Sequence, residues 1–286
     1  MRFALACALV AAFSVDPRSA IADRVTQLTR ESNWTLTASI HLQFRTWHPQ
    51  GLVRIGDTLF VSSVEVRSRE RAEGVGHLFK IDRSGVLIAD LTLGDGAIYH
   101  PGGIDYDGTQ IWVPVAEYRP DSRSIVYRVD PASMKATEVF RFADHIGAIV
   151  RNTDDDTLHG VSWGSRRLYR WKRGDERATP MQTINPSHYV DYQDCKYAGG
   201  GRMLCTGVTE MRQGAQRPSF RLGGIELVDL AAGRPLFQVP LLRWTSSGAA
   251  MTQNPAWFEA TATGLRGYFL PEDDASTLYV YDVETK

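Results

Sequence analysis

An internal repeat constrains this chain more than any other feature of its 286 residues. Two similar segments begin with His48-Pro49-Gln50-Gly51 and His100-Pro101-Gly102-Gly103, so that the two histidines lie 52 residues apart. Each segment continues with an apolar run, a turn of Gly and Asp, and a strand-like run that ends near a glutamate, Glu65 in the first and Glu117 in the second. A period of about 50 residues with strand-turn-strand content is typical of a β-propeller blade. The repeat therefore predicts an architecture, although it specifies no reaction.

The rest of the chain repeats the same pattern until five blades are counted. Their inner strands are expected to begin near His48, His100, His145, Tyr192 and Trp257. The last blade has no fourth strand before the chain ends, whereas residues 34–44 form an alternating strand with no local partner. We therefore predict an all-β fold, a five-bladed β-propeller whose N-terminal strand completes the last blade as its outer strand. Such closure joins the two ends of the ring and removes exposed strand edges.

Two other folds fit part of this pattern. A six-bladed ring would need a further blade within residues 205–256, where the spacing between strands is longer. A β-sandwich has a similar density of strands, but it does not predict histidines and Asp-turns that recur in phase. The five-bladed ring accounts for more of the repeat than either alternative.

The first 22 residues are predicted to be a signal peptide. Met1-Arg2 gives a positive start, residues 3–15 are mostly apolar, and Ala20-Ile21-Ala22 is an A-x-A cleavage signal. The apolar run is too short to span a bilayer, although a retained membrane anchor is the alternative. Residues 23–286 would then form a single propeller domain, and the expected location is periplasmic or secreted.

The charge balance narrows the range of partners. The chain has 32 basic and 33 acidic residues, for a formal net charge of −1. This balance gives no electrostatic reason to expect binding to nucleic acid or, once the leader is removed, to a membrane surface. The expected partner is a small polar molecule, and the oligomeric state stays open.

Two of the three cysteines, Cys195 and Cys205, lie outside the predicted leader. They flank the tight-turn sequence 198–201 symmetrically, which places them opposite each other on an antiparallel hairpin. Opposed residues on such a pair have Cα atoms about 4.5 to 5.5 Å apart, a separation that suits a disulfide. In an exported protein we therefore predict a Cys195–Cys205 bridge that pins one hairpin.

The inner strands of a propeller all begin on one face, and the second strands end there. This geometry predicts that His48, His100 and His145 converge on the ring axis. Further candidates on this face for binding a ligand are Gln50, Glu65, Glu117, Trp163, Tyr192 and Trp257. Asp194 and Glu259 are the candidates for catalytic acid or base, because clustered carboxylates in a poorly solvated funnel shift one another's pKa.

The three histidines also suggest a metal site. Neutral imidazoles with one carboxylate, Asp194 or Glu259, would suit zinc or iron, whereas carboxylates with Gln50 and backbone carbonyls would suit calcium. We therefore expect one divalent metal ion at His48, His100 and His145. The alternative is that these histidines hydrogen-bond a neighbouring blade and serve only to close the ring.

Several longer motifs carry a resemblance. They are His48-Pro49-Gln50-Gly51, His100 to Asp105, Val113 to Tyr118, Asp144 to Ala148 and His159 to Ser165. In these motifs the chain resembles an uncharacterised family of secreted bacterial and fungal β-propellers, known only as a domain of unknown function. The resemblance covers about residues 35 to 285 and implies a fold and a functional face, without a substrate. From the residues we predict an exported hydrolase or lyase acting on a small polar molecule. A non-catalytic propeller that binds a ligand or another protein is the alternative.

Overall fold

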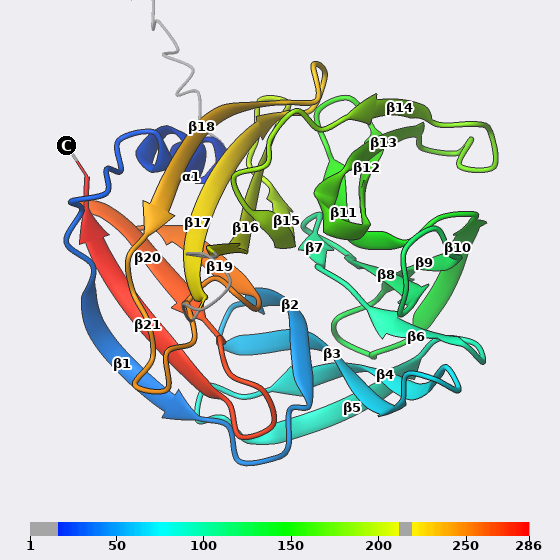
Figure 1. Cartoon of the computed structure of the whole chain (residues 1–286), viewed down its shortest axis with the longest axis horizontal. Coiled ribbons are helices and arrows are strands. Elements are labelled where there is room, and N and C mark those ends of the chain that lie inside the picture. The colour runs from blue at the N-terminus through cyan, green and yellow to red at the C-terminus, as the bar shows by residue number, and fades with distance from the viewer. Residues whose placement is uncertain (1–16, 212–218, 286) are drawn as a thin grey trace, which may run out of the picture.

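The computed structural model describes residues 17–211 and 219–285, and this part of the chain forms five antiparallel sheets around one axis (Figure 1). Residues 1–16, which include most of the predicted leader, lie outside the described residues. Blade 1 contains β2 (His48–Ile55), β3 (Thr58–Ser68), β4 (Glu73–Ile81) and β5 (Leu87–Leu93). Blade 2 contains β6 (Ile98–Pro101), β7 (Asp105–Tyr106), β8 (Ile111–Glu117), β9 (Ser124–Val129) and β10 (Ala136–Phe142).

The other three blades follow the same order from the axis outwards. Blade 3 contains β11 (Ile146–Asn152), β12 (Thr157–Ser162), β13 (Arg167–Lys172) and β14 (Met181–Ile184). Blade 4 contains β15 (Asp191–Tyr197), β16 (Arg202–Met211), β17 (Phe220–Asp229) and β18 (Arg234–Leu241). Blade 5 contains β19 (Ala256–Ala260), β20 (Gly264–Phe269), β21 (Thr277–Glu284) and the N-terminal strand β1 (Thr35–His41).

The ring is closed by β1, as the sequence predicts. This strand runs antiparallel to β21, with Ser39 opposite Tyr279, so the outer strand of the last blade comes from the start of the chain. In the described part of residues 205–255 the only strands are those of blade 4, so the five-bladed prediction is confirmed and the six-bladed alternative is wrong.

The hydrophobic core lies between neighbouring blades. Side chains alternate across a strand, so consecutive residues of β2 face different neighbours. Leu52 packs in a cluster shared with Tyr268 and Leu270 of blade 5, whereas Val53 packs with Ile104 and Val113 of blade 2. Most of β2 is buried on both faces, so apolar residues follow one another there.

The glycines of the repeated motifs allow the inner strands to approach closely. A Cβ atom at Gly51 would lie 2.6 Å from the backbone nitrogen of Ile104, and one at Gly103 would lie 2.8 Å from Asp194 Oδ1. Neither contact is sterically possible for a larger residue without moving the neighbouring strand. The repeated segments 48–51 and 100–103 therefore each place a histidine near the start of an inner strand. A glycine follows three residues later, at the point where two blades meet.

Buried charged groups fill the middle of the ring. Asp194 accepts hydrogen bonds from Leu52 N (2.9 Å) and Ile104 N (3.2 Å) and forms an ion pair with Lys196, which also donates to Ile104 O at 2.6 Å. Asp105 accepts from the backbone nitrogens of Arg151 (2.9 Å) and Tyr197 (3.3 Å). These side chains tie the inner strands of four blades together.

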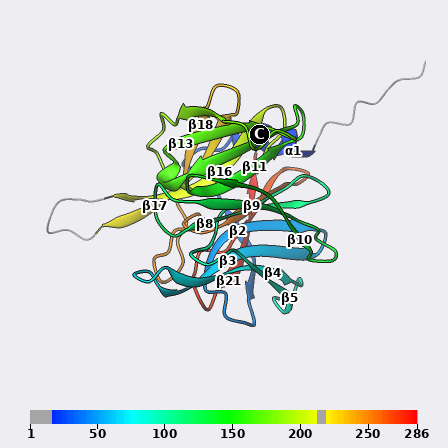
Figure 2. The same cartoon turned by 90° about the vertical axis from the view of Figure 1, so that its right-hand side faces the viewer.

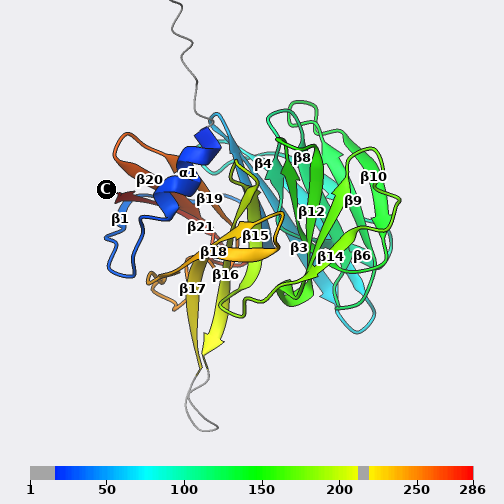
Figure 3. The same cartoon turned by 90° about the horizontal axis from the view of Figure 1, so that it is seen from above.

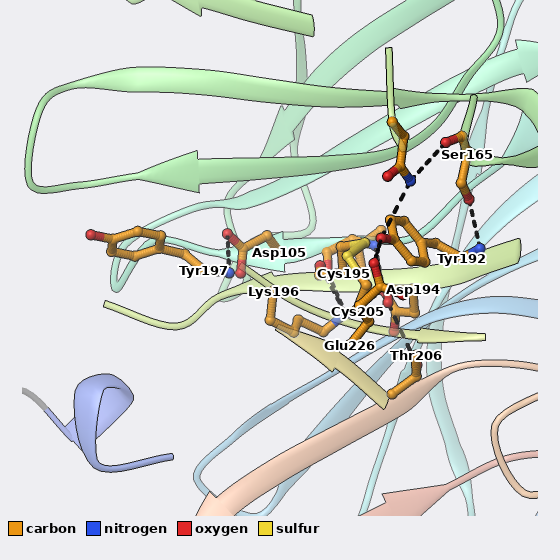
Figure 4. The surroundings of a disulfide bond; sticks show 12 residues. Asp105, Ser165, Tyr192, Asp194, Cys195, Lys196, Tyr197, Cys205, Thr206 and Glu226 are labelled. Atoms are coloured by element: carbon orange, nitrogen blue, oxygen red, sulfur yellow. Dashed lines mark hydrogen bonds and ion pairs between the residues drawn. A yellow bond between two sulfur atoms is a disulfide. The ribbon is translucent and has the colours of Figure 1, made fainter. Parts of the chain in front are cut away.

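The predicted disulfide is present beside this cluster (Figure 4). Cys195 on β15 lies directly opposite Cys205 on β16, with their Cα atoms 4.1 Å apart. Both cysteines are fully buried, so the bridge fixes the hairpin that carries Asp194 and Lys196.

A short helix, α1 (Pro17–Val25), covers the ring at the end opposite the long β16–β17 hairpin (Figures 2 and 3). Ala22 and Val25 are fully buried against blade 5, and Asp23 pairs with Arg202 of blade 4 at 2.9 Å. Arg24 donates to the carbonyls of Thr261 and Gly264, in the turn between β19 and β20. The predicted cleavage point after Ala22 thus lies inside a packed helix, and removal of a leader stays a prediction. None of the helices in the described residues is long and apolar enough to cross a bilayer.

Candidate functional site

The inner strands begin around a funnel of about 450 Å³ on the face opposite α1. All five blades or the segments that precede them contribute to its wall. The polar and aromatic side chains lining it are His48, Gln50, His100, Tyr118, His145, Ser162, Trp163, Asp191, Tyr192, Gln193, Glu210, Arg221, Gln253, Asn254 and Asp273. The three histidines that open the first three blades therefore reach one cavity, as the repeat predicts.

His48 forms a pair with a carboxylate in this funnel. Its Nδ1 lies 2.8 Å from Asp273 Oδ1, and Asn254 Nδ2 donates to the same oxygen at 2.9 Å. Burial by itself would raise the pKa of Asp273, but the hydrogen bond and the charge of His48 hold that pKa below its usual value. A hydrogen bond from His48 Nδ1–H to Asp273 favours the tautomer in which Nε2 carries the lone pair.

His145 is oriented in the same way by a backbone carbonyl. Its Nδ1 donates to Glu117 O at 2.9 Å, and its ring packs edge-on against Trp163 with 4.8 Å between ring centroids. Burial lowers the pKa of His145, which favours the neutral ring. With Nδ1 used as a donor, Nε2 of His145 is again the nitrogen that carries the lone pair.

His100 differs from the other two histidines because neither of its ring nitrogens has a hydrogen-bond partner among the described residues, although both are buried. The ring stacks on Tyr118 at 4.0 Å between centroids and lies 5.7 Å from the ring of His145. Burial, and then the charge of His145, lower the pKa of His100 well below its usual value. A buried, unsatisfied imidazole costs free energy unless a water or a ligand supplies the missing hydrogen bond.

Six of the predicted site residues meet in the funnel. They are His48, His100, His145, Gln50, Trp163 and Tyr192. The hydroxyl of Tyr192 donates a hydrogen bond to the buried carboxylate of Glu226 in blade 4 (Figure 4). This bond fixes the position of the Tyr192 ring at the wall of the funnel.

The other predicted side chains lie outside the funnel. Glu65 pairs with Arg67 at 2.9 Å, and Glu117 is held between Arg119 and Arg123, each at 2.6 Å. Trp257 packs between blades, and its Nε1 donates to Glu259 at 3.3 Å.

The two predicted catalytic carboxylates also have other partners. Glu259 lies near the far end of β19, where it pairs with Arg54 at 2.7 Å and accepts a hydrogen bond from Tyr268 at 3.0 Å. Asp194 is fully enclosed, with its oxygens bonded to Lys196 and to two backbone nitrogens. Burial raises the pKa of Asp194 to about 7, against the opposing effect of Lys196. Neither group lines the funnel.

Sequence reasoning missed several residues of the wall. Tyr118, Gln193, Arg221, Gln253 and Asn254 were not expected there. Gln253 and Asn254 lie three and two residues before β19, close to the start of an inner strand as His48 and His145 are, and this position was the available signal. Tyr118 directly follows β8, where the second strand of blade 2 returns to the funnel face.

The histidines match a metal site in chemistry but not in spacing. Within residues 17–211 and 219–285, no group of three or more His, Cys, Asp or Glu side chains is arranged so that it could hold a metal ion. The orientation of His48 and His145 through Nδ1 is nevertheless the arrangement that metal-bound histidines use. The metal at His48, His100 and His145 stays a prediction.

The protein is thus a closed five-bladed β-propeller, and its candidate site is the histidine-lined funnel on one face of the ring. The chain belongs to the family described as "Family of unknown function (DUF6454)", which matches residues 4–286. This membership agrees with the family resemblance seen in the sequence, and no curated protein matches the sequence.

Solved structures share the fold only. A tail fibre of Staphylococcus aureus phage P68 is similar with a TM-score of 0.53 and 9% identity, over 90% of this chain and 53% of that one. A hypothetical protein from Leishmania major has a TM-score of 0.52 and 10% identity, over 86% and 90% of the two chains. The match to hydrazine synthase of Kuenenia stuttgartiensis has 13% identity and a TM-score of 0.40, and it covers 82% of this chain and 65% of that chain.

Proposed function

We propose that the funnel binds a small polar molecule and that His48, oriented by Asp273, removes a proton from it or from a water beside it. The observation that carries this proposal is the 2.8 Å contact between His48 Nδ1 and Asp273, with both residues on the wall of the funnel. Proton removal from water leads to hydrolysis, whereas proton removal from carbon next to an electron-withdrawing group leads to elimination. The proposed class is therefore a hydrolase or a lyase.

The chemistry of the pair supports this role. When His48 Nε2 takes a proton, the new positive charge lies beside an ionised carboxylate, which stabilises the imidazolium form. His145, with its Nδ1 fixed on Glu117 O, offers a second unprotonated nitrogen at the same funnel. His100 lines the same funnel, and its ring nitrogens have no hydrogen-bond partner among the described residues.

To test the proposal, the protein is incubated with a bacterial metabolite extract, and mass spectrometry measures which compounds are depleted. Wild-type protein should deplete at least one small polar metabolite, and His48→Gln and Asp273→Asn should each slow that depletion by about 100-fold or more, the usual contribution of a general base. His77→Gln is a matched control, because His77 contacts Asp90 through Nδ1 at 3.0 Å but lies outside the funnel. Depletion that is equally fast in His48→Gln would contradict the proposed base.

A metal-bound funnel is the second candidate function, supported by the orphaned nitrogens of His100 and the fixed orientation of the other two rings. His48, His100 and His145 would hold zinc or iron, which would supply a Lewis acid at the same place. Elemental analysis of untagged protein should then give about one equivalent of metal, lost in His100→Ala, and chelation should lower the melting temperature. Metal-free wild-type protein of unchanged stability would remove this candidate and leave the His48–Asp273 base.

A further inference from the structure

The funnel has two chemically different walls. Blades 2 and 3 supply an aromatic wall, defined here as His100, Tyr118, His145 and Trp163. The opposite side is an amide wall, defined here as Gln50, Gln193, Gln253 and Asn254. Such a division is informative about the ligand, because each wall matches a different surface of a bound molecule.

The rings of the aromatic wall pack on one another, and Trp163 is the most exposed of them. Tyr118 stacks on His100 at 4.0 Å, and Trp163 lies 5.8 Å from Tyr118 and 4.8 Å from His145, measured between ring centroids. Trp163 is 37% exposed, although it is one of the largest apolar side chains of the protein. An exposed tryptophan at the mouth of a concave site is a common anchor for a ligand.

The backbone holds Trp163 in this exposed position. It begins a short 3-10 turn in which the next two residues, Gly164 and Ser165, both have left-handed φ angles of 59° and 60°. The unfavourable conformation of Ser165 is offset by two hydrogen bonds, from Tyr192 N to Ser165 Oγ (2.6 Å) and from Asn185 Nδ2 to Ser165 O (2.9 Å). Strain of this kind persists only where the surrounding structure enforces it, and it is concentrated at functional sites.

The amide wall offers both donors and acceptors. The side-chain amide of Gln193 has no hydrogen-bond partner among the described residues and can both donate and accept, whereas Asn254 donates from Nδ2 to Pro271 O and Asp273 and keeps only Oδ1 free as an acceptor. A hydroxyl group both donates and accepts a hydrogen bond, and a primary amide is its natural partner because it does the same. A ligand with several adjacent hydroxyls would use these free groups best.

The charges of the funnel argue against two other ligand classes. Asp191, Glu210 and Asp273 line the wall together with a single arginine among the described lining residues, Arg221, so the balance of charge disfavours a multiply charged anion such as a nucleotide. A quaternary ammonium ion would compete with Arg69, whose guanidinium already lies 3.9 Å from the centroid of Tyr118. A neutral cyclic molecule with an apolar face and polar groups at its edge is neither repelled by these carboxylates nor in competition with Arg69.

We propose that the ligand of the funnel is a sugar, with the C–H face of a pyranose ring on Trp163 and its hydroxyls on Gln193 and Asn254. This inference rests on the proposed function, because it names the class of molecule on which His48 and Asp273 act. The volume of about 450 Å³ lies within the range of small-molecule sites, roughly 300 to 1,000 Å³. In this arrangement the aromatic wall selects the ring, and the amide wall selects the positions of its hydroxyls.

Binding of the labelled full-length protein to a glycan array, followed by titration of the selected sugar by tryptophan fluorescence, tests the inference. Wild-type protein should bind at least one class of glycan. Trp163→Ala should weaken that binding at least about tenfold, equivalent to about 1.4 kcal/mol, whereas Trp163→Phe should keep it within about threefold because the ring is retained. Ile184→Ala is the control, since Ile184 is a large apolar side chain that is 65% exposed but does not line the funnel.

The outcomes separate the sugar from the base. If no glycan binds while the metabolite extract still loses a non-sugar compound in a His48-dependent way, the sugar is overturned and the proposed function stands. If a glycan binds through Trp163 but no compound is turned over, the sugar is supported and the base role of His48 is overturned. Equal affinity of the wild type and Trp163→Ala for the glycan would also overturn the assignment of the sugar to this funnel.

Discussion

Two polar clusters lie in the ring, and they differ in how well their hydrogen bonds are satisfied. In the buried cluster, Asp194 and Asp105 are bonded to backbone nitrogens of neighbouring blades, and Lys196 pairs with Asp194. In the funnel, His100 has no partner for either nitrogen and Gln193 has none for its amide within the described residues. His77, Tyr99 and Trp171 also carry buried polar atoms without a partner among the described residues, so a missing hydrogen bond points to function only where, as at His100, the side chain also lines the funnel.

The difference predicts opposite responses to mutation, and the largest effect is expected at Asp194. Asp194→Ala leaves Lys196 buried without a counter-ion and leaves Leu52 N and Ile104 N without acceptors, so we expect a loss of about 3 to 5 kcal/mol in the free energy of unfolding. His48→Gln, in the funnel, should change that free energy by less than about 1 kcal/mol. Urea unfolding of both variants provides the comparison. Equal losses would mean that the funnel, too, is part of the structural framework.

The buried cluster also predicts a dependence of stability on pH. Burial raises the pKa of Asp105 to about 6, well above its value in an unfolded chain. A raised carboxyl pKa favours the protonated form in the folded state, so this contribution is fully present below about pH 4 and is lost as pH rises to about 6. The change amounts to at most about 3 kcal/mol. Asp105→Asn keeps a hydrogen-bond acceptor and should flatten this part of the stability profile relative to wild type, whereas parallel profiles would show that Asp105 does not titrate in this range.

The end of the ring opposite the funnel gives a smaller, separate test. If α1 belongs to the folded domain, removal of residues 1–22 should reduce the free energy of unfolding by about 2 kcal/mol, because it removes the buried Ala22 and the partly buried Ile21. Removal of residues 1–16 leaves α1 whole and is the matched control. Equal stability of the two truncated proteins would support the leader boundary expected from the A-x-A signal.

The repeat was sufficient to predict the fold and the convergence of three histidines, because both depend on the phase of strands rather than on detailed contacts. It could not place Asp194 or Glu259. The pairing of the inner strands shifts register near the start of β2, β6, β11 and β15, for instance between Tyr192 and Asp194, and such bulges change which way the following side chains point.

Other features of the site lay equally beyond the sequence. Glu259 sits near the far end of β19 because that strand is only five residues long, and strand length is poorly defined by sequence. The pairing of His48 with Asp273 joins the first blade to the last across the closure of the ring, so no local pattern could reveal it.

The proposal that His48 acts as a base is tested most sharply by measuring which ring nitrogen of each funnel histidine carries a proton. Two-dimensional correlation of histidine ring nitrogens and protons by NMR at pH 8, assigned with His48→Gln and His145→Gln, reports which nitrogen carries the proton. We expect the Nδ1–H tautomer for His48 and His145, with Nε2 unprotonated, because Asp273 and Glu117 O accept from Nδ1. The Nε2–H tautomer at His48, which free histidine prefers, would contradict the proposed base and with it the reading of the funnel as the functional site.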